Sequence, residues 1–208
     1  PSWPPPGTRP WCFHLRSGGR LDVMSSSVDE SSTGYVYDPA DPTPSVHGPA
    51  VMGGVRVREM SALEQRNDTV SFTSEPLDHD VDAIGPVKVE LCIRSDREHT
   101  DFYACLCDVD SRGRPLQVVD GYLRLRPGRP EADASGVRRI TLECWPTAYR
   151  FKQGHKLKVI IASGAHPRYA RNLGTGEPLA SAVRMVPAQQ EILHGARYNS
   201  SISLMQMD

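Results

Sequence analysis

Alternation of apolar and polar residues is the dominant pattern along the chain. Val87, Val89, Leu91 and Ile93 stand two positions apart, and charged residues separate several of them. A period of two places successive side chains on opposite faces of a β-strand, so this run predicts a half-buried strand. The same alternation predicts further strands at residues 102–106, 122–126, 137–145, 157–161 and 202–205. Only residues 60–67 suit a helix, and a short one.

Turn-forming residues separate these segments at short intervals. Turns are predicted at residues 110–113, 126–128 and 163–164. Many short strands joined by frequent turns are typical of a β-sandwich. We therefore predict an all-β fold, a jelly-roll β-sandwich of the galactose-binding-domain-like kind, with few or no helices. The 208 residues suffice for one such domain, which we place at residues 11–208, after a proline-rich arm at residues 1–10.

A second proline-rich stretch follows a strand predicted at residues 35–37. Asp38 with Pro39, and Asp41 with Pro42, end that strand, because proline donates no hydrogen bond to a sheet and makes the preceding residue extended. The sequence therefore predicts a rigid, extended arm that leaves the edge of a sheet and is suited to docking. The long segment at residues 165–187 is expected to be a functional loop or a covering one.

The overall composition argues against two classes of partner. A formal net charge of −1 and a pI near 6.8 disfavour nucleic-acid binding, which requires a basic domain. No apolar run approaches the roughly 20 residues of a membrane-spanning helix. We therefore expect neither nucleic acid nor membrane as a partner. Because the sequence has no initiator methionine and no signal-peptide pattern, we interpret Pro1 as the start of a fragment of a longer protein.

The five cysteines indicate a reducing environment. Cys105 and Cys107 lie two apart in a predicted strand, so both point to one face and do not easily reach disulfide geometry. No pair has the C-x-x-C spacing of zinc and redox sites. We predict five reduced, mostly buried thiols and a cytoplasmic protein.

Candidates for catalysis or metal binding are weak. An α/β-hydrolase needs a G-x-S-x-G turn for its nucleophile, and the sequence contains none, so we assign no catalytic residue. The acidic cluster at residues 78–82 could hold a cation, although a polar loop between strands is the simpler interpretation. Residues 108–113 are likewise better explained by a β-turn in which an aspartate accepts backbone N–H groups. We expect no metal and no cofactor.

The tryptophans allow two interpretations. Trp3, Trp11 and Trp145, with several tyrosines, could form a sugar-binding platform, as in carbohydrate-binding modules. Scattered aromatic residues in a sandwich more often anchor a core or an interface. The sequence alone leaves both open.

Asp101 is a candidate structural residue. It stands at the start of the strand predicted from residue 102, where its carboxylate could accept backbone N–H bonds. Buried donors that lose such an acceptor destabilise a fold, so we expect Asp101 to support stability.

Short motifs along nearly the whole chain resemble one family. Residues 35–48, Y-V-Y-D-P-A-D-P-T-P-S-V-H-G, closely resemble a signature of the X-prolyl dipeptidyl-peptidase and cocaine-esterase (CocE/NonD) family of serine hydrolases. In that family this stretch opens the non-catalytic C-terminal jelly-roll domain. Further motifs that resemble this domain stand in order at residues 3–8, 14–19, 73–77, 85–87, 100–102, 108–109, 120–121, 151–155 and 167–172.

The resemblance implies that the chain is the non-catalytic part of a larger enzyme. An upstream α/β-hydrolase domain of the same polypeptide would carry the Ser-Asp-His triad and hydrolyse an acyl ester or an X-Pro peptide bond. The jelly roll would support that domain and help to wall its substrate pocket, and residues 1–10 would lead in from it. The sequence does not decide whether the protein forms a homo-oligomer. The alternative function is a free-standing carbohydrate-binding module.

The same resemblance suggests two groups of site residues. Apolar residues directly after the arm resemble the family segment that contacts the acyl side of the substrate, although a core strand is an equal alternative there. These candidate pocket-wall residues are Ala50, Val51 and Met52. The residues expected to dock against the catalytic domain are Trp3, Tyr37, Asp38 and Asp41.

Overall fold

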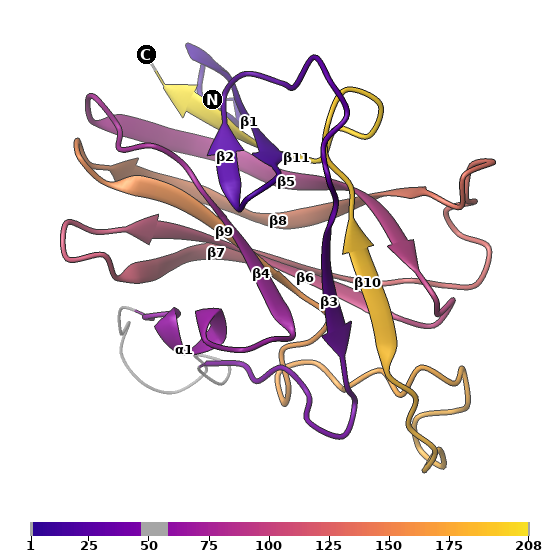
Figure 1. Ribbon diagram of the computed structural model, residues 1–208. Coiled ribbons are helices and arrows are strands. Elements are labelled where there is room, and N and C mark those ends of the chain that lie inside the picture. Colours follow the sequence, from indigo (N-terminus) through magenta and orange to yellow (C-terminus); the bar gives the residue numbers. More distant parts are fainter. Residues whose placement is uncertain (1, 47–57, 208) are drawn as a thin grey trace.

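The computed structural model describes residues 2–46 and 58–207, and nearly all regular structure in them is β-strand (Figure 1). The elements in chain order are β1 (Thr8–Arg16), β2 (Arg20–Asp22), β3 (Thr33–Tyr37), α1 (Ser61–Glu64), β4 (Thr69–Thr73), β5 (Val81–Ser95), β6 (Asp101–Val109), β7 (Pro115–Arg124), β8 (Arg138–Phe151), β9 (Lys156–Ala162), β10 (Ala188–Ile192) and β11 (Ser201–Met207). Helix α1 lies inside the predicted helical segment. Among the described residues, no helix has the length and apolar character of a membrane-spanning segment.

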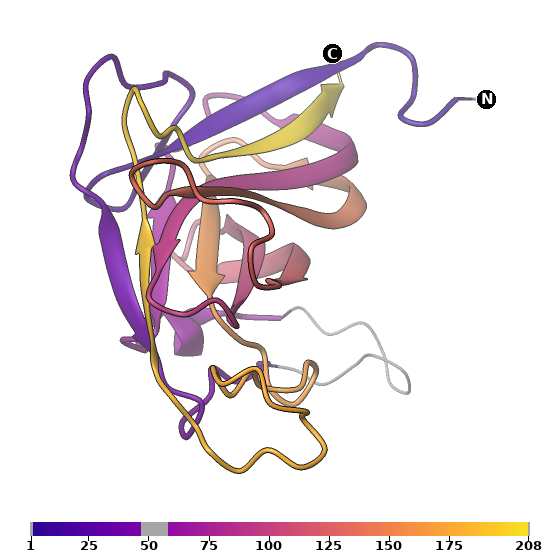
Figure 2. The same cartoon turned by 90° about the vertical axis from the view of Figure 1, so that its right-hand side faces the viewer.

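The strands form a jelly-roll sandwich around one main core, which confirms the predicted fold class. Hydrogen-bonded neighbours follow the order β3-β10-β5-β11-β1-β2-β4-β9-β6-β7, and β8 pairs with the other edge of β5. One layer contains β8, β5, β11 and β1, and the other contains β4, β9, β6 and β7. A parallel bridge between Arg20 and Thr73 links the two layers through β2 and β4. Figure 2 shows β3 and β10 along one side of the sandwich.

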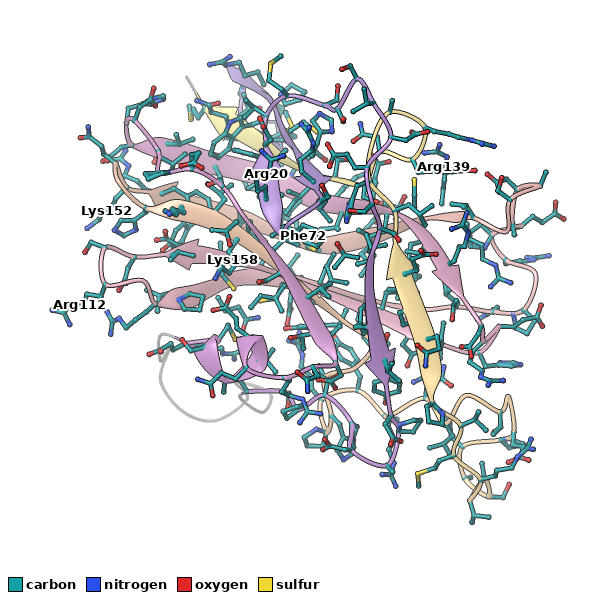
Figure 3. The ribbon with its side chains drawn as sticks, in the orientation of Figure 1. Arg20, Phe72, Arg112, Arg139, Lys152 and Lys158 are labelled. Carbon is teal, nitrogen blue, oxygen red and sulfur yellow. The ribbon has the colours of Figure 1, made fainter. Side chains whose placement is uncertain are left out.

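The main core follows from the alternation in the sequence. On β5, Val87, Val89, Leu91 and Ile93 are all buried, as predicted, and on β4 Phe72 (labelled in Figure 3) is also fully buried. Each buried side chain of this size stabilises the fold by about 1.5–3 kcal/mol relative to an exposed one. The predicted half-buried strands therefore supply most of the core.

Strand β6 differs from the others because it is buried on both faces. Its even-numbered residues from 102 to 106 join the main core, whereas Tyr103, Cys105 and Cys107 point outward into a second cluster. The residues that cover this second cluster come from α1, β9 and the segment after β9, and they are Met60, Leu63, Ile160, Ala162 and Ala165. The domain thus covers the outer face of β6 with its own chain.

Several strands and boundaries differ from the sequence prediction. Strands β2, β4 and β10 were not predicted, and no alternation predicted β1. Strands β5, β7 and β8 extend beyond their predicted bounds, and β7 begins at Pro115, seven residues before the alternation at 122–126 begins. The sequence of β10 is polar, A-Q-Q-E-I, and carries no period of two. Its Gln190 is nevertheless buried, because its Nε2 donates a 2.5 Å hydrogen bond to Thr100 Oγ1. A distant partner, rather than local pattern, therefore makes this segment part of the sheet.

The free edges of β7 and β8 approach each other closely at Gly121. A Cβ atom added to Gly121 would lie 2.9 Å from Cys144 Sγ and 3.1 Å from the backbone oxygen of Glu143. Real Cβ contacts are longer than this, so a side chain at this position would push the two strands apart.

The proline-rich stretch after β3 is only partly extended. Strand β3 ends at Tyr37 as predicted, but Asp38 then forms a turn, in which its Oδ1 accepts the Ala40 N–H at 2.8 Å and its backbone oxygen accepts the Asp41 N–H at 3.1 Å. Aspartate commonly stabilises a turn in this way. The expectation of an extended arm from residue 38 is therefore corrected to a turn followed by an extended segment.

Candidate functional site: a buried polar network and two outer faces

A buried carboxylate organises the outer end of β6 and β7. Asp101 is 1% exposed and accepts hydrogen bonds from Arg124 Nε at 2.9 Å, Arg124 Nη2 at 2.8 Å and Asn172 Nδ2 at 2.8 Å. The hydroxyl of Tyr122 also donates to it. Burial, followed by the charge of Asp101, raises the pKa of Tyr122, which therefore stays a donor. Among the described residues, the partners of Asp101 are side chains of β7 and of a distant loop and not the expected backbone donors.

A second buried carboxylate, on the neighbouring strand β7, is bound in a similar way. Asp120 of β7 is buried and accepts hydrogen bonds from Tyr103 Oη at 3.1 Å and from Arg168 Nη1. The Arg168 guanidinium lies 5.2 Å from the ring centre of Tyr169, which stacks on Tyr122 with centroids 4.0 Å apart and planes at 7°. The two carboxylates and the aromatic stack together hold residues 165–172 against β6 and β7.

The segment after the turn is held by the same loop. The His166 N–H donates to the Thr43 oxygen at 2.9 Å, and the Ser45 N–H donates to the His166 oxygen at 2.6 Å. Arg171 Nη1 donates to the Pro39 oxygen at 3.1 Å. Residues 39–45 are therefore fixed to the domain itself along one side.

A third acidic residue fixes the other side of this segment. Asp68 is buried and accepts hydrogen bonds from Thr43 Oγ1 and Arg66 Nε, both at 2.7 Å. Arg66 also reaches Asp41 at 3.1 Å, whose carboxylate is 80% exposed. Helix α1 is tied in nearby, where Lys158 of β9 (labelled in Figure 3) pairs with Glu64.

The structure separates the residues predicted to dock. Trp3 is 58% exposed and Asp38 and Asp41 are exposed, but Tyr37 is 2% exposed and packs over Gly164 inside the domain. Tyr37 shares one face of β3 with the other tyrosine of that strand, which is why both point inward. Its expected docking role is therefore corrected to a role in the core.

The exposed docking candidates lie at two ends of the molecule. Figures 1 and 2 show the first described residues on the upper side, beside the end of β11, and the turn after β3 on the lower side. The structure thus does not bring Trp3 together with Asp38 and Asp41. The pocket-wall candidates Ala50, Val51 and Met52 lie outside the described residues, and their assignment stays a prediction.

The acidic residues considered for metal binding have other partners. Asp80 accepts the Gln153 N–H at 2.8 Å, and Asp82 accepts Arg150 Nε at 2.6 Å. Asp110 accepts the N–H groups of Arg112 and Arg114, which is the predicted β-turn. Hydrogen bonds from Arg114 lower the pKa of Asp110 to about 2. Within residues 2–46 and 58–207, no three metal-ligating side chains gather.

One histidine is paired with a buried carboxylate. His155 Nδ1 lies 2.9 Å from Asp108 Oδ1, and Tyr149 Oη donates to Asp108 Oδ2 at 2.8 Å. These bonds join the turn between β8 and β9 to the end of β6. Over the ranges that the structure describes, no hydroxyl of serine or threonine is hydrogen-bonded to this histidine, so the pair lacks the nucleophile of a hydrolytic triad.

The sugar-platform interpretation is not supported by the arrangement of the tryptophans. Trp11 packs on Phe13 with ring centroids 4.7 Å apart at the edge of the core, while Trp3 and Trp145 are exposed. A shallow hollow of about 330 Å³ lies over β3, β10 and β5, and no aromatic residue lines it. The residues that line it are Gly34, Arg94, Ser95, Asp96, Gln189, Gln190 and Glu191.

All five cysteines are free, as predicted, and four of them are buried. Cys105 Sγ and Cys107 Sγ lie 3.6 Å apart in the second cluster. Burial raises the pKa of Cys105 well above its ordinary value and that of Cys144 to about 12. These thiols are therefore protonated and weakly nucleophilic at neutral pH.

Comparison with known proteins gives a consistent result. The model of the family described as the X-Pro dipeptidyl-peptidase C-terminal non-catalytic domain matches residues 1–203. A cocaine esterase of Rhodococcus sp. is 30% identical over 219 residues, which cover 97% of this chain and 38% of that protein. The chain therefore spans less than half the length of this relative.

Two solved structures share the fold. An aminopeptidase from the marine sediment archaeon Thaumarchaeota archaeon superposes with a TM-score of 0.86 at 18% identity, over 100% of this chain and 38% of that one. An α-amino acid ester hydrolase superposes with a TM-score of 0.80 at 23% identity, over 93% of this chain and 36% of that one. In both, the sandwich is again a minor part of a longer chain.

Proposed function

The chain belongs to the family of X-Pro dipeptidyl-peptidase C-terminal non-catalytic domains, and from that premise we propose that it supports a serine-hydrolase domain that precedes it in the same polypeptide. The observation that carries this proposal is the match over residues 1–203 together with the 38% share of the cocaine esterase. The missing share is ample for an α/β-hydrolase domain.

The proposed parent enzyme cleaves an acyl ester or an X-Pro amide by way of an acyl-enzyme. The jelly roll contributes no reacting group and acts by packing. Its second contribution is to one wall of the substrate pocket, through Ala50, Val51 and Met52. The fixed position of residues 39–45, held by Asp68 and His166, supports this, because it gives the residues that follow a rigid base.

An active-site fluorophosphonate probe tests whether the catalytic serine lies outside the 208-residue chain. We expect the full-length polypeptide to be labelled at one serine, and the 208-residue chain to stay unlabelled. Stoichiometric labelling of a serine within the 208 residues would contradict the proposal.

Substrate selectivity tests the pocket wall. In the full-length enzyme, Met52→Ala should alter the ratio of kcat/KM values for bulky and small acyl groups by an amount equivalent to about 1–3 kcal/mol, the usual worth of one apolar contact in a pocket. Met24→Ala is the matched control, because Met24 lies in an exposed loop. If Met52→Ala lowers stability and leaves that ratio unchanged, the residue belongs to the core.

The proposed location is the cytoplasm. The support is chemical, since five free cysteines suit a reducing compartment. Alkylation in denaturant without reductant should add five groups to the protein isolated from its native cells. A mass that lacks one or more adducts would reveal a disulfide or a blocked thiol and contradict this location.

A further inference from the structure

We infer that Asp68 is a positioning residue for the substrate pocket of the full-length enzyme, because it ties together the two ends of the segment that carries the proposed pocket wall at residues 50–52. The inference rests on the proposed function and deepens it by naming a residue that sets acyl selectivity without touching the substrate. The residues that lead into this segment (41–46) are here called the entry stem, and those that lead out of it (58–68) the exit stem.

Side chains of the exit stem bind the entry stem directly. Asp68 Oδ2 accepts the Thr43 hydroxyl at 2.7 Å, and Asp68 Oδ1 accepts Arg66 Nε at 2.7 Å. Arg66 Nη2 in turn donates to the backbone oxygen of Asp41 at 2.9 Å and to its carboxylate at 3.1 Å. Two residues of the exit stem are therefore bonded to two residues of the entry stem.

The bond between Asp68 and Thr43 is shielded from water. Thr43 is 0% exposed, and the Asp68 side chain is 9% exposed. Hydrogen bonds to a buried, charged acceptor are stronger than exposed ion pairs, and their loss leaves a buried donor without a partner. This bond therefore holds the two stems at a fixed spacing.

The exit stem is also fixed to the sheet where it begins. The backbone oxygen of Arg58 accepts the Gln117 N–H at 2.8 Å, and the Met60 N–H donates to the Pro115 oxygen at 2.8 Å. The Met60 side chain is 2% exposed and lies in the second cluster, against which Val46 of the entry stem also packs. Both stems therefore rest on the outer face of β6, and Figure 1 shows α1 and the chain after β3 on the same lower side of the molecule.

A pocket wall carried between two fixed stems is placed by the bonds that fix them. Misplacement by about 1 Å near a reacting substrate can lower a rate by about 100-fold. Without the Asp68 carboxylate, the stems would keep only their separate contacts with the sheet and with His166. The wall would then fit a bulky acyl group less well, whereas a small acyl group, which makes fewer contacts, would be affected little.

Kinetics of the full-length enzyme test the inference. The para-nitrophenyl esters of benzoate and acetate share a leaving group and differ in acyl bulk, so the ratio of their kcat/KM values reports acyl selectivity. Asp68→Asn should lower the benzoate-to-acetate ratio by about three- to tenfold, less than the full loss of one wall contact. The rate of labelling by a small alkyl fluorophosphonate should stay unchanged, because the catalytic serine is untouched.

Glu30→Gln is the matched control. The Glu30 side chain is also 9% exposed and is also bonded to an arginine, Arg16, but it precedes β3, whereas the entry stem follows that strand. Glu30→Gln should lower the urea midpoint of unfolding and leave the benzoate-to-acetate ratio unchanged. Equal shifts of the ratio in Asp68→Asn and Glu30→Gln would overturn the inference, because a general loss of stability would explain both.

A second pair of variants keeps the test valid if Asp68→Asn does not fold. Thr43→Val removes the hydroxyl donor, keeps the shape of the side chain and leaves the bonds between Arg66 and Asp68 in place. Thr43→Val should lower the ratio in the same direction, and Thr43→Ser, which retains the donor, should keep the wild-type ratio. A purely structural role would not make selectivity follow the hydroxyl group.

The inference and the proposed function fail in different ways. If Met52→Ala changes the ratio while Asp68→Asn and Thr43→Val do not, Asp68 only stabilises the domain, so the inference fails and the proposed pocket wall stands. If Asp68→Asn changes the ratio while Met52→Ala does not, Asp68 acts through something other than this wall, and the inference fails together with the wall. Fluorophosphonate labelling of the 208-residue chain would contradict the proposed function, whatever the two ratios are.

Discussion

The outer faces of the two layers of the sandwich differ in how far the chain covers them. The outer face of β6 and β7 is covered by the domain's own chain, and the buried carboxylates of Asp101 and Asp120 anchor that cover through Asn172 and Arg168. The outer face of β5 and β8 is covered near Cys92 by Leu193 and Tyr198, whereas around Trp145 it is exposed and its charges pair across the two strands. A face that a domain covers itself contributes to its stability, whereas the exposed area around Trp145, here called the open face, contributes little in this way.

The two faces also differ in the elements that their contacts join. On the covered face, Asp101 and Asn172 stand 71 residues apart, so their hydrogen bond closes a long loop. On the open face, Lys88 and Glu143 are simply opposite one another in the β5 and β8 ladder. The hydrogen bond between Asp101 and Asn172 fixes a distant loop against the sheet. The ion pair between Lys88 and Glu143 adds only a side-chain contact between two strands that already pair in the sheet.

Removal of the Asp101 carboxylate should have the largest effect. Asp101→Ala leaves Arg124, Tyr122 and Asn172 without their common acceptor, and we expect a loss of about 3 kcal/mol in the free energy of unfolding. Urea unfolding of the 208-residue chain measures it. Asp41→Ala is the control, because its carboxylate also pairs with an arginine but is 80% exposed. Equal losses in the two variants would show that the covered face is not held by buried charge.

Crowding at Gly85 tests the open face. Gly85→Ala would force a Cβ against Met205 and Pro4 at a backbone conformation unsuited to alanine, which should cost about 2 kcal/mol. Gly113→Ala is the matched control, since its φ is +79° but no atom lies within 4 Å of the added Cβ. Urea midpoints should therefore fall further for the first variant. The reverse order would mean that Pro4 and Met205 move aside freely.

The aromatic stack should contribute a smaller share to the covered face. Tyr169→Ala removes the ring that stacks on Tyr122 and that the Arg168 guanidinium contacts. We expect the free energy of unfolding to fall by about 1 kcal/mol more than the loss of buried apolar area alone would cause. Tyr169→Phe keeps the ring and should retain most of the stability. Calorimetry of the three proteins distinguishes them, and a Phe variant as weak as the Ala variant would refute the role of stacking.

The charges of the open face should have the smallest effect. Hydrogen bonds from Arg150 lower the pKa of Asp82 below its usual 3.8, so the pair stabilises the fold above that pH and loses its contribution as the pH falls through the lowered value. Asp82→Asn should therefore be slightly destabilising at pH 7 and neutral in strong acid. Because the Arg150 side chain is 61% exposed and that of Asp82 35%, about 1 M salt should also abolish the difference. A difference that persists in salt would indicate a buried pair.

The sequence was sufficient where the structure depends on local periodicity. The alternation from Val87 to Ile93 predicted both the strand and its buried face, because a period of two has only one structural meaning over that length. The aspartate turn at Asp110 followed from a local preference as well. The family, and with it the non-catalytic role, followed from motifs in order.

What the sequence could not supply was set by register and distant partners. Asp101 was predicted to be structural, but its partners Arg124 and Asn172 are chosen by the folded chain. The alternation of β8 already placed Trp145 on the outer face, but it did not decide between a sugar platform and an anchor. Tyr37 was assigned to docking although its alternation with Val36 already indicated an inward side chain.

The close approach at Gly121 has a consequence for how the protein behaves at high concentration. Strands β7 and β8 both present an unpaired edge among the described strands, and such edges can recruit strands from other molecules and begin aggregation. Because Gly121 has no side chain, the two edges lie against each other at the corner where the layers meet. Each edge obstructs access to the other, so these two edges are protected from templating a fibril without closure into a barrel.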